Sequence, residues 1–254
     1  MNSGRTPMKG ELTLLICFVI AGIGYAQQTK TRTVTIVDPG GPGKPPSDAV
    51  VLFNGRDTSG WTTIDGKPCK CTVAKGVMIC RTGAGDIRTI EEFQDAQIHL
   101  EFNLPYEPEM KGQARANSGV LLQNRYEIQI LDSYENETYP DGSCGALYGQ
   151  SAPLVNACRR PGEWQSFDII FHAPRCSPNG GVQTPGSLTL LHNGVLIQDH
   201  VPVRGRKCVE KGPLVLQDHS MYVGRKIAIS PGIEGPAPDT TIQFRDIWLR
   251  KLTE

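Results

Sequence analysis

Hydrophobic and polar residues alternate with a period of two along much of this chain. In Gln97–Leu104 every second residue is apolar, and Glu163–Ala173 repeats the pattern with Phe167, Ile169 and Phe171 on one face. Successive side chains of a β-strand point to opposite faces, so this alternation predicts half-buried strands. No window of the sequence carries the sustained period of about 3.6 residues that indicates an amphipathic helix.

Turn signals separate these segments. His192-Asn193-Gly194 lies between Ser187–Leu191 and Val195–Gln198, which is the strong Asn-Gly signal of a β-hairpin. About ten short strands joined by such turns predict an all-β fold, a two-sheet antiparallel β-sandwich. We favour a jelly roll of the lectin type, because the concave face of such a curved sheet can hold a ligand.

The stretch Ser118–Ser133 has a pattern of its own. From residue 123 onward, long polar side chains share one face of the expected strand and the other face is largely apolar. Such a row is costly to bury unless it meets water or a ligand, so we predict the floor of a polar binding site. Asp132 breaks the parity, which places it at the strand end, after a bulge, or toward the core. The row consists of Gln123, Arg125, Glu127 and Gln129.

A second polar group ends the strand expected at Gly212–Ser220, where Gln217, Asp218 and His219 follow each other. Combined with the first stretch, it provides carboxylates, an imidazole and a cation. That set suffices for proton transfer beside a carbonyl, for glycosidic cleavage, or for calcium coordination. Tyr148 could stack on a sugar or pack in the core. The residues alone therefore leave a lectin and an enzyme equally open.

Composition narrows the partners. The chain has 254 residues, with 26 basic and 26 acidic side chains and no formal net charge. Zero net charge gives no electrostatic reason to expect nucleic acid or an anionic membrane surface as a partner. The sequence does not predict an oligomeric state.

The amino terminus predicts export. Arg5 and Lys9 precede the apolar run Leu12–Gly24, and small residues flank Tyr25, as in a secretory signal peptide. An uncleaved anchor is the alternative reading, although the run is short for a membrane span. We expect residues 1–26 to be a signal peptide, residues 27–48 a Pro/Gly-rich flexible linker that does not pack, and residues 49–254 one domain.

Cysteine usage agrees with a periplasmic or extracellular location. Eight cysteines are present, and several of the seven that follow Cys17 should pair in an oxidising compartment. Lys75-Gly76 forms a turn signal midway between Cys71 and Cys80, so a hairpin would place these two residues opposite each other as a disulfide. Seven is an odd number, so at least one thiol stays free or pairs between chains.

Nine short motifs occur in an order that resembles the bacterial 3-keto-disaccharide hydrolase domain family. The resemblance covers roughly Val50–Leu252, and the agreement in order is more specific than any single motif. The motifs are Leu52–Gly55 with Ser59–Trp61, Gly85–Ile87, Asn117–Val120, Tyr126–Asp132, Cys144–Gly149, Gly162–Gln165, His192–Val195, Gly212–His219 and Phe244–Trp248.

This resemblance implies a concanavalin-like jelly roll that acts on sugars oxidised at C3. A 3-ketone acidifies the C2 hydrogen, so a base can remove that proton while the glycosidic oxygen leaves C1. Water then adds to the 3-keto-2-hydroxy-glucal, and the net result is hydrolysis. The reaction needs a base near C2, an electrophile on the ketone oxygen and an acid for the leaving group.

The expected roles follow from the resemblance. Glu127, Asp132 and His219 are the candidate catalytic residues. The same three are the candidate ligands of a divalent metal ion, which the resemblance suggests as a possible electrophile. A non-catalytic carbohydrate-binding module, like a lectin, is the competing hypothesis. The expected substrate-binding residues are Arg125, Gln129, Gln217, Asp218 and Tyr148.

Overall fold

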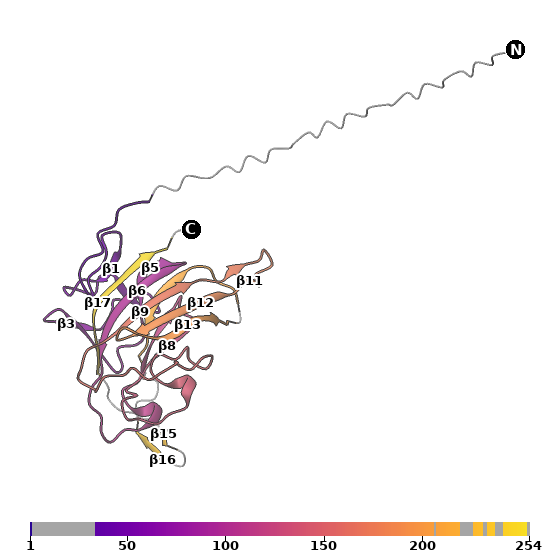
Figure 1. The fold of residues 1–254 in the computed structure, drawn as a ribbon. Helices are drawn as coiled ribbons and strands as arrows, with labels where there is room; N and C mark the ends of the chain where they lie inside the picture. Colours follow the sequence, from indigo (N-terminus) through magenta and orange to yellow (C-terminus); the bar gives the residue numbers. More distant parts are fainter. Residues whose placement is uncertain (2–33, 206, 219–225, 231–232, 237–240, 253–254) are drawn as a thin grey trace. The chain divides into compact units, whose positions relative to one another are not determined.

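The computed structural model describes residues 1, 34–205, 207–218, 226–230, 233–236 and 241–252. The predicted signal peptide, apart from Met1, and the candidate His219 lie outside these residues. The described part from Val37 onward forms antiparallel β-sheets with two single turns of 3-10 helix, η1 (Gly112–Ala114) and η2 (Pro140–Gly142). The prediction of an all-β, jelly-roll sandwich is confirmed (Figure 1). No helix in the described residues has the length and apolarity needed to cross a membrane.

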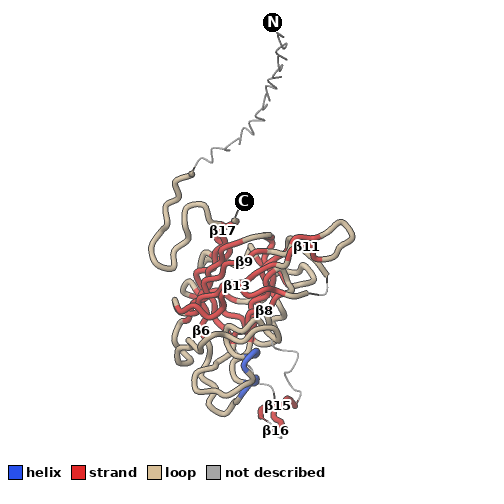
Figure 2. Tube along the Cα trace, turned by 45° about the vertical axis from the view of Figure 1, so that its right-hand side comes forward, coloured by secondary structure: helices blue, strands red, loops and turns tan. Residues whose placement is uncertain are grey.

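The larger sheet has eight strands in the order β13-β12-β9-β6-β17-β4-β3, with β1 also paired to β17. Figure 2 shows several of these strands side by side. Their bounds are β13 (Val195–Val203), β12 (Gly186–His192), β9 (Gln165–His172), β6 (Ala96–Asn103), β17 (Thr241–Lys251), β4 (Val77–Arg81), β3 (Thr72–Ala74) and β1 (Val50–Phe53).

The smaller sheet has five strands in the order β2-β5-β14-β7-β8. Two further hairpins, β10 (Arg175–Cys176) with β11 (Val182–Thr184) and β15 (Lys226–Ser230) with β16 (Ile233–Pro236), stand outside the two large sheets. The strands of the smaller sheet are β2 (Trp61–Thr63), β5 (Ile87–Phe93), β14 (Gly212–Leu216), β7 (Ser118–Leu122) and β8 (Tyr126–Ile130).

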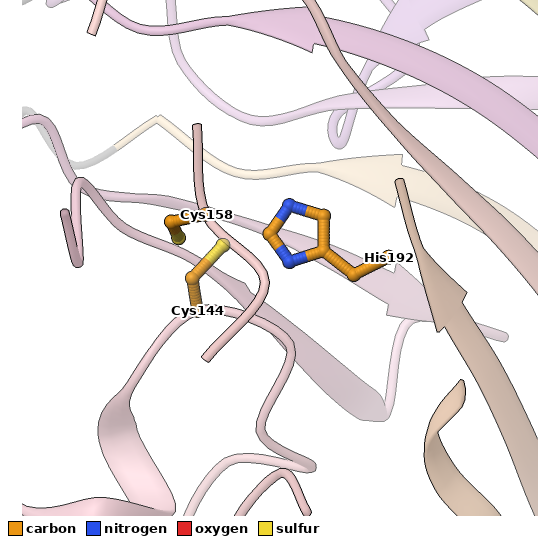
Figure 3. Close-up of side chains that lie close together, drawn as sticks. All are labelled: Cys144, Cys158 and His192. Carbon is orange, nitrogen blue, oxygen red and sulfur yellow. The ribbon is translucent and has the colours of Figure 1, made fainter. Parts of the chain in front are cut away.

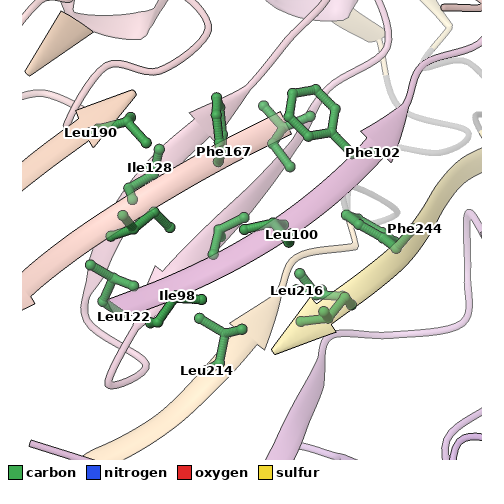
Figure 4. Close-up of a cluster of buried hydrophobic side chains, with 14 of the residues drawn as sticks. Ile98, Leu100, Phe102, Leu122, Ile128, Phe167, Leu190, Leu214, Leu216 and Phe244 are labelled. Atoms are coloured by element: carbon green, nitrogen blue, oxygen red, sulfur yellow. The ribbon is translucent and has the colours of Figure 1, made fainter. Parts of the chain in front are cut away.

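The core contains apolar residues from both sheets. Every second residue of β6 is fully buried there, as the alternation in Gln97–Leu104 predicts. The core also contains buried side chains from the smaller sheet: Leu122 of β7, Ile128 of β8 and Leu216 of β14 (Figure 4). Because side chains alternate along a strand, the residues between these buried ones lie on the outer face of the smaller sheet. That face is where the polar residues gather.

The stretch Ser118–Ser133 is a hairpin, so the prediction of one continuous strand is wrong. Gln123 and Asn124 both have φ of 55°, and the Arg125 N–H donates to the Leu122 carbonyl at 3.0 Å. Two successive positive φ angles make a tight turn whose twist matches the flanking strands. Gln123 turns inward and its Nε2 donates to the Phe93 carbonyl, while Arg125 is exposed in the turn. Only Glu127 and Gln129 of the predicted row remain on one strand.

The last part of the Pro/Gly-rich segment, which precedes the predicted domain in the sequence, contacts the larger sheet. The Gly43 carbonyl accepts a hydrogen bond from Trp248 Nε1 at 3.2 Å, and Asp48 forms an ion pair with Arg250 at 2.8 Å. Both partners lie on β17. The sequence predicts that residues 27–48 do not pack, and the structure differs for this part because β17 supplies an aromatic donor and a cation.

Two disulfides are present among the described residues. Cys71 pairs with Cys80, as the hairpin pattern predicts, since the register of β3 and β4 places Thr72 opposite Ile79. Cys176 pairs with Cys208 across a sequence separation of 32 residues. Cys69, Cys144 and Cys158 are free thiols.

Candidate active site

Strand register brings four residues into one row across the outer face of the smaller sheet. Gly119 of β7 lies opposite Gln129 of β8. The Gln217 N–H donates to the Gly119 carbonyl at 2.9 Å, directly after β14. Asp86 stands just before β5, whose Ile87 pairs with Leu216 of β14. The row therefore runs Asp86, Gln217, Gly119, Gln129, and it joins the β7–β8 hairpin to the ends of β14 and β5, which are distant in the sequence.

Glu127 belongs to the neighbouring row and leans over Gly119. A Cβ placed on Gly119 would lie 2.8 Å from Glu127 Oε1, closer than real Cβ atoms come to a neighbour, and 3.1 Å from Glu127 Cγ. The missing side chain therefore makes the space that the Glu127 carboxylate occupies. In that position the carboxylate accepts a hydrogen bond from the side chain of Gln217.

The environment of Glu127 favours its protonated form. Burial raises the pKa of Glu127 above its usual value, the Gln217 hydrogen bond lowers it in part, and the charge of Asp86 raises it again. Burial also raises the pKa of Asp86, whose carboxylate accepts the Asp218 N–H at 2.7 Å. Two carboxyl groups that both resist ionisation are typical of a site built for proton transfer.

Two tyrosines stand beside Glu127. Residues 146–148 pair with the free edge of β8, where the Tyr148 N–H donates to the Glu127 carbonyl at 2.9 Å. This pairing places Tyr148 on the same face as Glu127. Its hydroxyl lies 2.5 Å from the Tyr139 hydroxyl, and the side chains are 39% and 45% exposed, so solvent or a ligand reaches both. Burial, the Tyr148 hydrogen bond and nearby charges that include Glu127 raise the pKa of Tyr139.

A network of amides continues the site beyond Gln129. Gln113 Nε2 donates to the Gly142 carbonyl, and this hydrogen bond orients the Gln113 side chain. Gln113 Oε1 then accepts a hydrogen bond from Gln129 Nε2 at 2.9 Å. Asn117 Nδ2 donates to the Gln113 carbonyl at 2.8 Å. Within the part of the chain that the structure describes, the buried side-chain oxygens of Asn117, Gln129 and Gln217 accept no hydrogen bond. Buried polar atoms are rarely left without a partner, so these three acceptors suit the hydroxyl donors of a bound ligand.

Asp132 lies apart from this cluster. It is buried in an ion pair with Arg115 at 2.9 Å, and its other carboxylate oxygen accepts the Tyr134 N–H at 3.1 Å. Burial raises the pKa of Asp132, and the Arg115 charge opposes that effect. Both residues line a separate cavity of about 330 Å³ with Tyr134 and Arg160. Asp132 therefore holds the loops around it together.

Asp218 follows Gln217 at the end of the row, but its carboxylate binds the backbone of the turn at Gly83–Gly85. Its carboxylate accepts the Gly83 N–H at 3.0 Å and the Gly85 N–H at 2.6 Å, which closes the turn ahead of Asp86. Arg125 is exposed in the hairpin turn of the smaller sheet. Of the site residues predicted from the sequence, the structure brings together Glu127, Gln129, Gln217 and Tyr148.

The two candidate metal ligands that the structure describes, Glu127 and Asp132, have different hydrogen-bond partners. The Asp132 carboxylate pairs with Arg115 and accepts the Tyr134 N–H, whereas the Glu127 carboxylate accepts a hydrogen bond from Gln217, and His219 lies outside the described residues. The donors around Glu127 are one further carboxylate and neutral amides. A divalent ion on Glu127, Asp132 and His219 stays a prediction, because the described residues do not include His219.

Sequence reasoning did not select five residues of the cluster: Asp86, Gln113, Asn117, Gly119 and Tyr139. Asp86 and Gly119 stand inside motifs of the resemblance, Gly85–Ile87 and Asn117–Val120, and this signal could have found them. Gln113 and Tyr139 lie in irregular segments whose course no periodicity predicts.

Comparisons with known proteins agree on the family. The sequence model of the 3-keto-alpha-glucoside-1,2-lyase-like domain matches residues 48–250. A candidate glycosyl hydrolase from Parabacteroides distasonis is 36% identical, with a TM-score of 0.78, and the match covers 93% of this chain and 100% of that chain. A second candidate glycosyl hydrolase from that organism is 19% identical, with a TM-score of 0.56 over 81% of this chain and 94% of its own, and shows the fold alone. No curated protein matches. The chain therefore belongs to the carbohydrate-active 3-keto-alpha-glucoside-1,2-lyase-like domain family.

Proposed function

We propose that this protein cleaves the glycosidic bond of 3-keto-glycosides by elimination, with Glu127 as the base. The observation that carries the proposal is the partly buried Glu127 carboxylate, held over Gly119 beside Asp86 and hydrogen-bonded to Gln217. The family model supports the substrate class. The row of polar groups on the outer face of the smaller sheet supports a sugar as the ligand.

Glu127 would remove the C2 proton. The ketone at C3 makes this hydrogen acidic, and a carboxylate whose pKa is raised is a stronger base than an ordinary glutamate. The electrons of the C–H bond form a double bond between C2 and C1, and the C1–O bond to the leaving group breaks. The proton stays on Glu127, and the departing oxygen takes one from another donor.

The two tyrosines can supply that donor. One hydrogen bond joins their hydroxyls, so the pair has a second hydroxyl hydrogen that points elsewhere. The raised pKa of Tyr139 keeps its proton in place at neutral pH. We assign Tyr139 and Tyr148 as hydrogen-bond or proton donors to the substrate oxygen that gains negative charge, which is either the enolate oxygen or the leaving-group oxygen. Water that adds to the glucal product completes net hydrolysis.

The buried amide oxygens would bind sugar hydroxyls. Asn117, Gln129 and Gln217 each offer an acceptor, and a sugar hydroxyl is a matching donor. The same face would serve a non-catalytic lectin, and what favours an enzyme is the Asp86–Glu127 carboxyl pair. Export to the periplasm or the outside of the cell remains our proposal for its location, and the two disulfides are consistent with it.

Incubation of the purified protein with a 3-keto-glucoside should release the leaving group. Glu127→Gln should lower kcat roughly 100- to 10,000-fold, the range for a lost general base. Glu92→Gln is the matched control, because Glu92 is a solvent-exposed carboxylate on β5 that pairs with Lys211. Binding of sugars without release of the leaving group from any anomer would support the lectin and refute the enzyme.

The pH profile of kcat/KM should report the Glu127 environment. Activity falls as the pH drops through the pKa of Glu127, because the base must be ionised. Asp86→Asn removes a charge that raises the pKa of Glu127, so the acid limb should move to lower pH. The asparagine oxygen can still accept the Asp218 N–H, which keeps the local structure. Gln217→Leu removes a hydrogen bond that lowers the pKa of Glu127, so the limb should move to higher pH. Shifts of about one pH unit are expected, and shifts in the same direction would contradict the assignment.

Gly119→Ala should separate activity from stability. The added methyl group displaces the end of a flexible side chain, Glu127, and touches no other residue so closely. Alanine is favoured over glycine in a strand, so the free energy of unfolding should stay constant or rise by up to about 1 kcal/mol. We expect kcat to fall roughly 100-fold, since a misplacement of about 1 Å costs that much. An unchanged kcat would show that the carboxylate position over Gly119 is irrelevant to the reaction.

A further inference from the structure

A second group of reactive side chains lies away from the active site and has no role in the proposed reaction. Cys144 and Cys158 belong to the long segment between β8 and β9, and His192 ends β12. One ligand atom from each residue lies within 4.8 Å of the other two. Figure 3 shows the edge of the His192 ring that carries both nitrogens facing the two thiols.

The hydrogen bonds of Gln165 determine the tautomer of His192. Gln165 Oε1 accepts the backbone N–H of Arg159 at 3.1 Å, so this atom is an acceptor. His192 Nε2 lies 2.8 Å from the same oxygen and must therefore donate to it. The imidazole is neutral, because it is fully buried and pairs with no carboxylate of the described residues. Nδ1 then carries a lone pair and no hydrogen.

That lone pair is buried without a partner. His192 is 0% exposed, and within the described residues its Nδ1 accepts no hydrogen bond. Cys144 is 2% exposed and Cys158 is partly buried. A neutral imidazole whose other nitrogen is held by a hydrogen bond is the usual state of a metal-ligating histidine. Two thiols and one imidazole nitrogen together form a set of soft metal ligands.

We propose that Cys144, Cys158 and His192 bind a soft d10 metal ion, Cu(I) or Zn(II), at a structural site. Thiolate and imidazole ligands select these ions, and metal–ligand bonds of about 2.0–2.3 Å require donors about 4 Å apart, within reach of the present arrangement. Binding releases the two thiol protons to solvent. The three donors match three-coordinate Cu(I), and Zn(II) would need a fourth, for which the Leu131 carbonyl lies 3.9 Å from Cys158 Sγ.

A disulfide between Cys144 and Cys158 is the competing outcome. It would satisfy the sulfurs but leave His192 Nδ1 buried without any donor, which is unfavourable. A metal ion gives His192 Nδ1 a partner and also binds both sulfurs, whose present contacts are weak thiol hydrogen bonds. It would also join the segment that carries Tyr139 and Tyr148 to β12 of the larger sheet, and so support one wall of the active site.

Metal binding tests the proposal without reference to activity. The full chain, purified without oxygen or chelator, should bind one equivalent of Cu(I) in competition with bathocuproine disulfonate, or one of Zn(II) in competition with a chromogenic chelator. The two arms identify the ion. Cys158→Ser and His192→Gln should each weaken binding at least about 100-fold. Cys69→Ser is the matched control, because Cys69 is a free, partly buried thiol outside the cluster, and it should bind as the wild type does.

Thermal unfolding provides the second readout. The bound ion should raise the Tm of the wild type and of Cys69→Ser, and should leave the Tm of Cys158→Ser and His192→Gln unchanged. Equal Tm values of all four proteins without metal would show that the variants fold. The proposal is overturned if the wild type binds neither ion, if both ligand variants bind as tightly as the wild type, or if peptide mass spectrometry of the purified chain finds Cys144 joined to Cys158.

Discussion

The proposed active site depends on one contact, the approach of the Glu127 carboxylate to the backbone of Gly119. A side chain at position 119 would force that carboxylate away from Gln217 and toward solvent. With glycine at position 119, Glu127 is partly buried and hydrogen-bonded to Gln217, and the charge of Asp86 raises its pKa. The antiparallel register of β5, β14, β7 and β8 makes this possible, because it places residues from four strands in one row. A shift of one residue in any pair would send these side chains into the core.

Much of the fold could be predicted from the sequence. The strict alternation in Gln97–Leu104 and in Glu163–Ala173 becomes β6 and β9, and the His192-Asn193-Gly194 signal becomes the β12–β13 hairpin. These predictions are confirmed because local pattern and burial agree. The continuous strand through Gln123 is wrong for a local reason as well: the apolar–polar alternation runs through a turn, and Gln123-Asn124 lacks the glycine that marks such turns most clearly.

The candidate site was predicted in part. Glu127, Gln129, Gln217 and Tyr148 converge, and their parity or their family motif could be read from the sequence. Asp132 shares a motif with Glu127 but pairs with Arg115, a residue whose position depends on the course of a loop. Asp86 joins the site through the pairing of β5 with β14, across more than one hundred residues of chain. Pairing between distant strands is the information that a single sequence does not display.

In the proposed active site the protein holds the Glu127 carboxyl in a state that resists ionisation. A carboxyl carbon titration by NMR, with ¹³C-labelled glutamate and Glu127→Gln to assign the signal, measures this directly. We expect the pKa of Glu127 to exceed the ordinary value of 4.5 and to fall when Asp86 is replaced by asparagine. A pKa of Glu127 at or below 4.5, unaffected by that substitution, would contradict it.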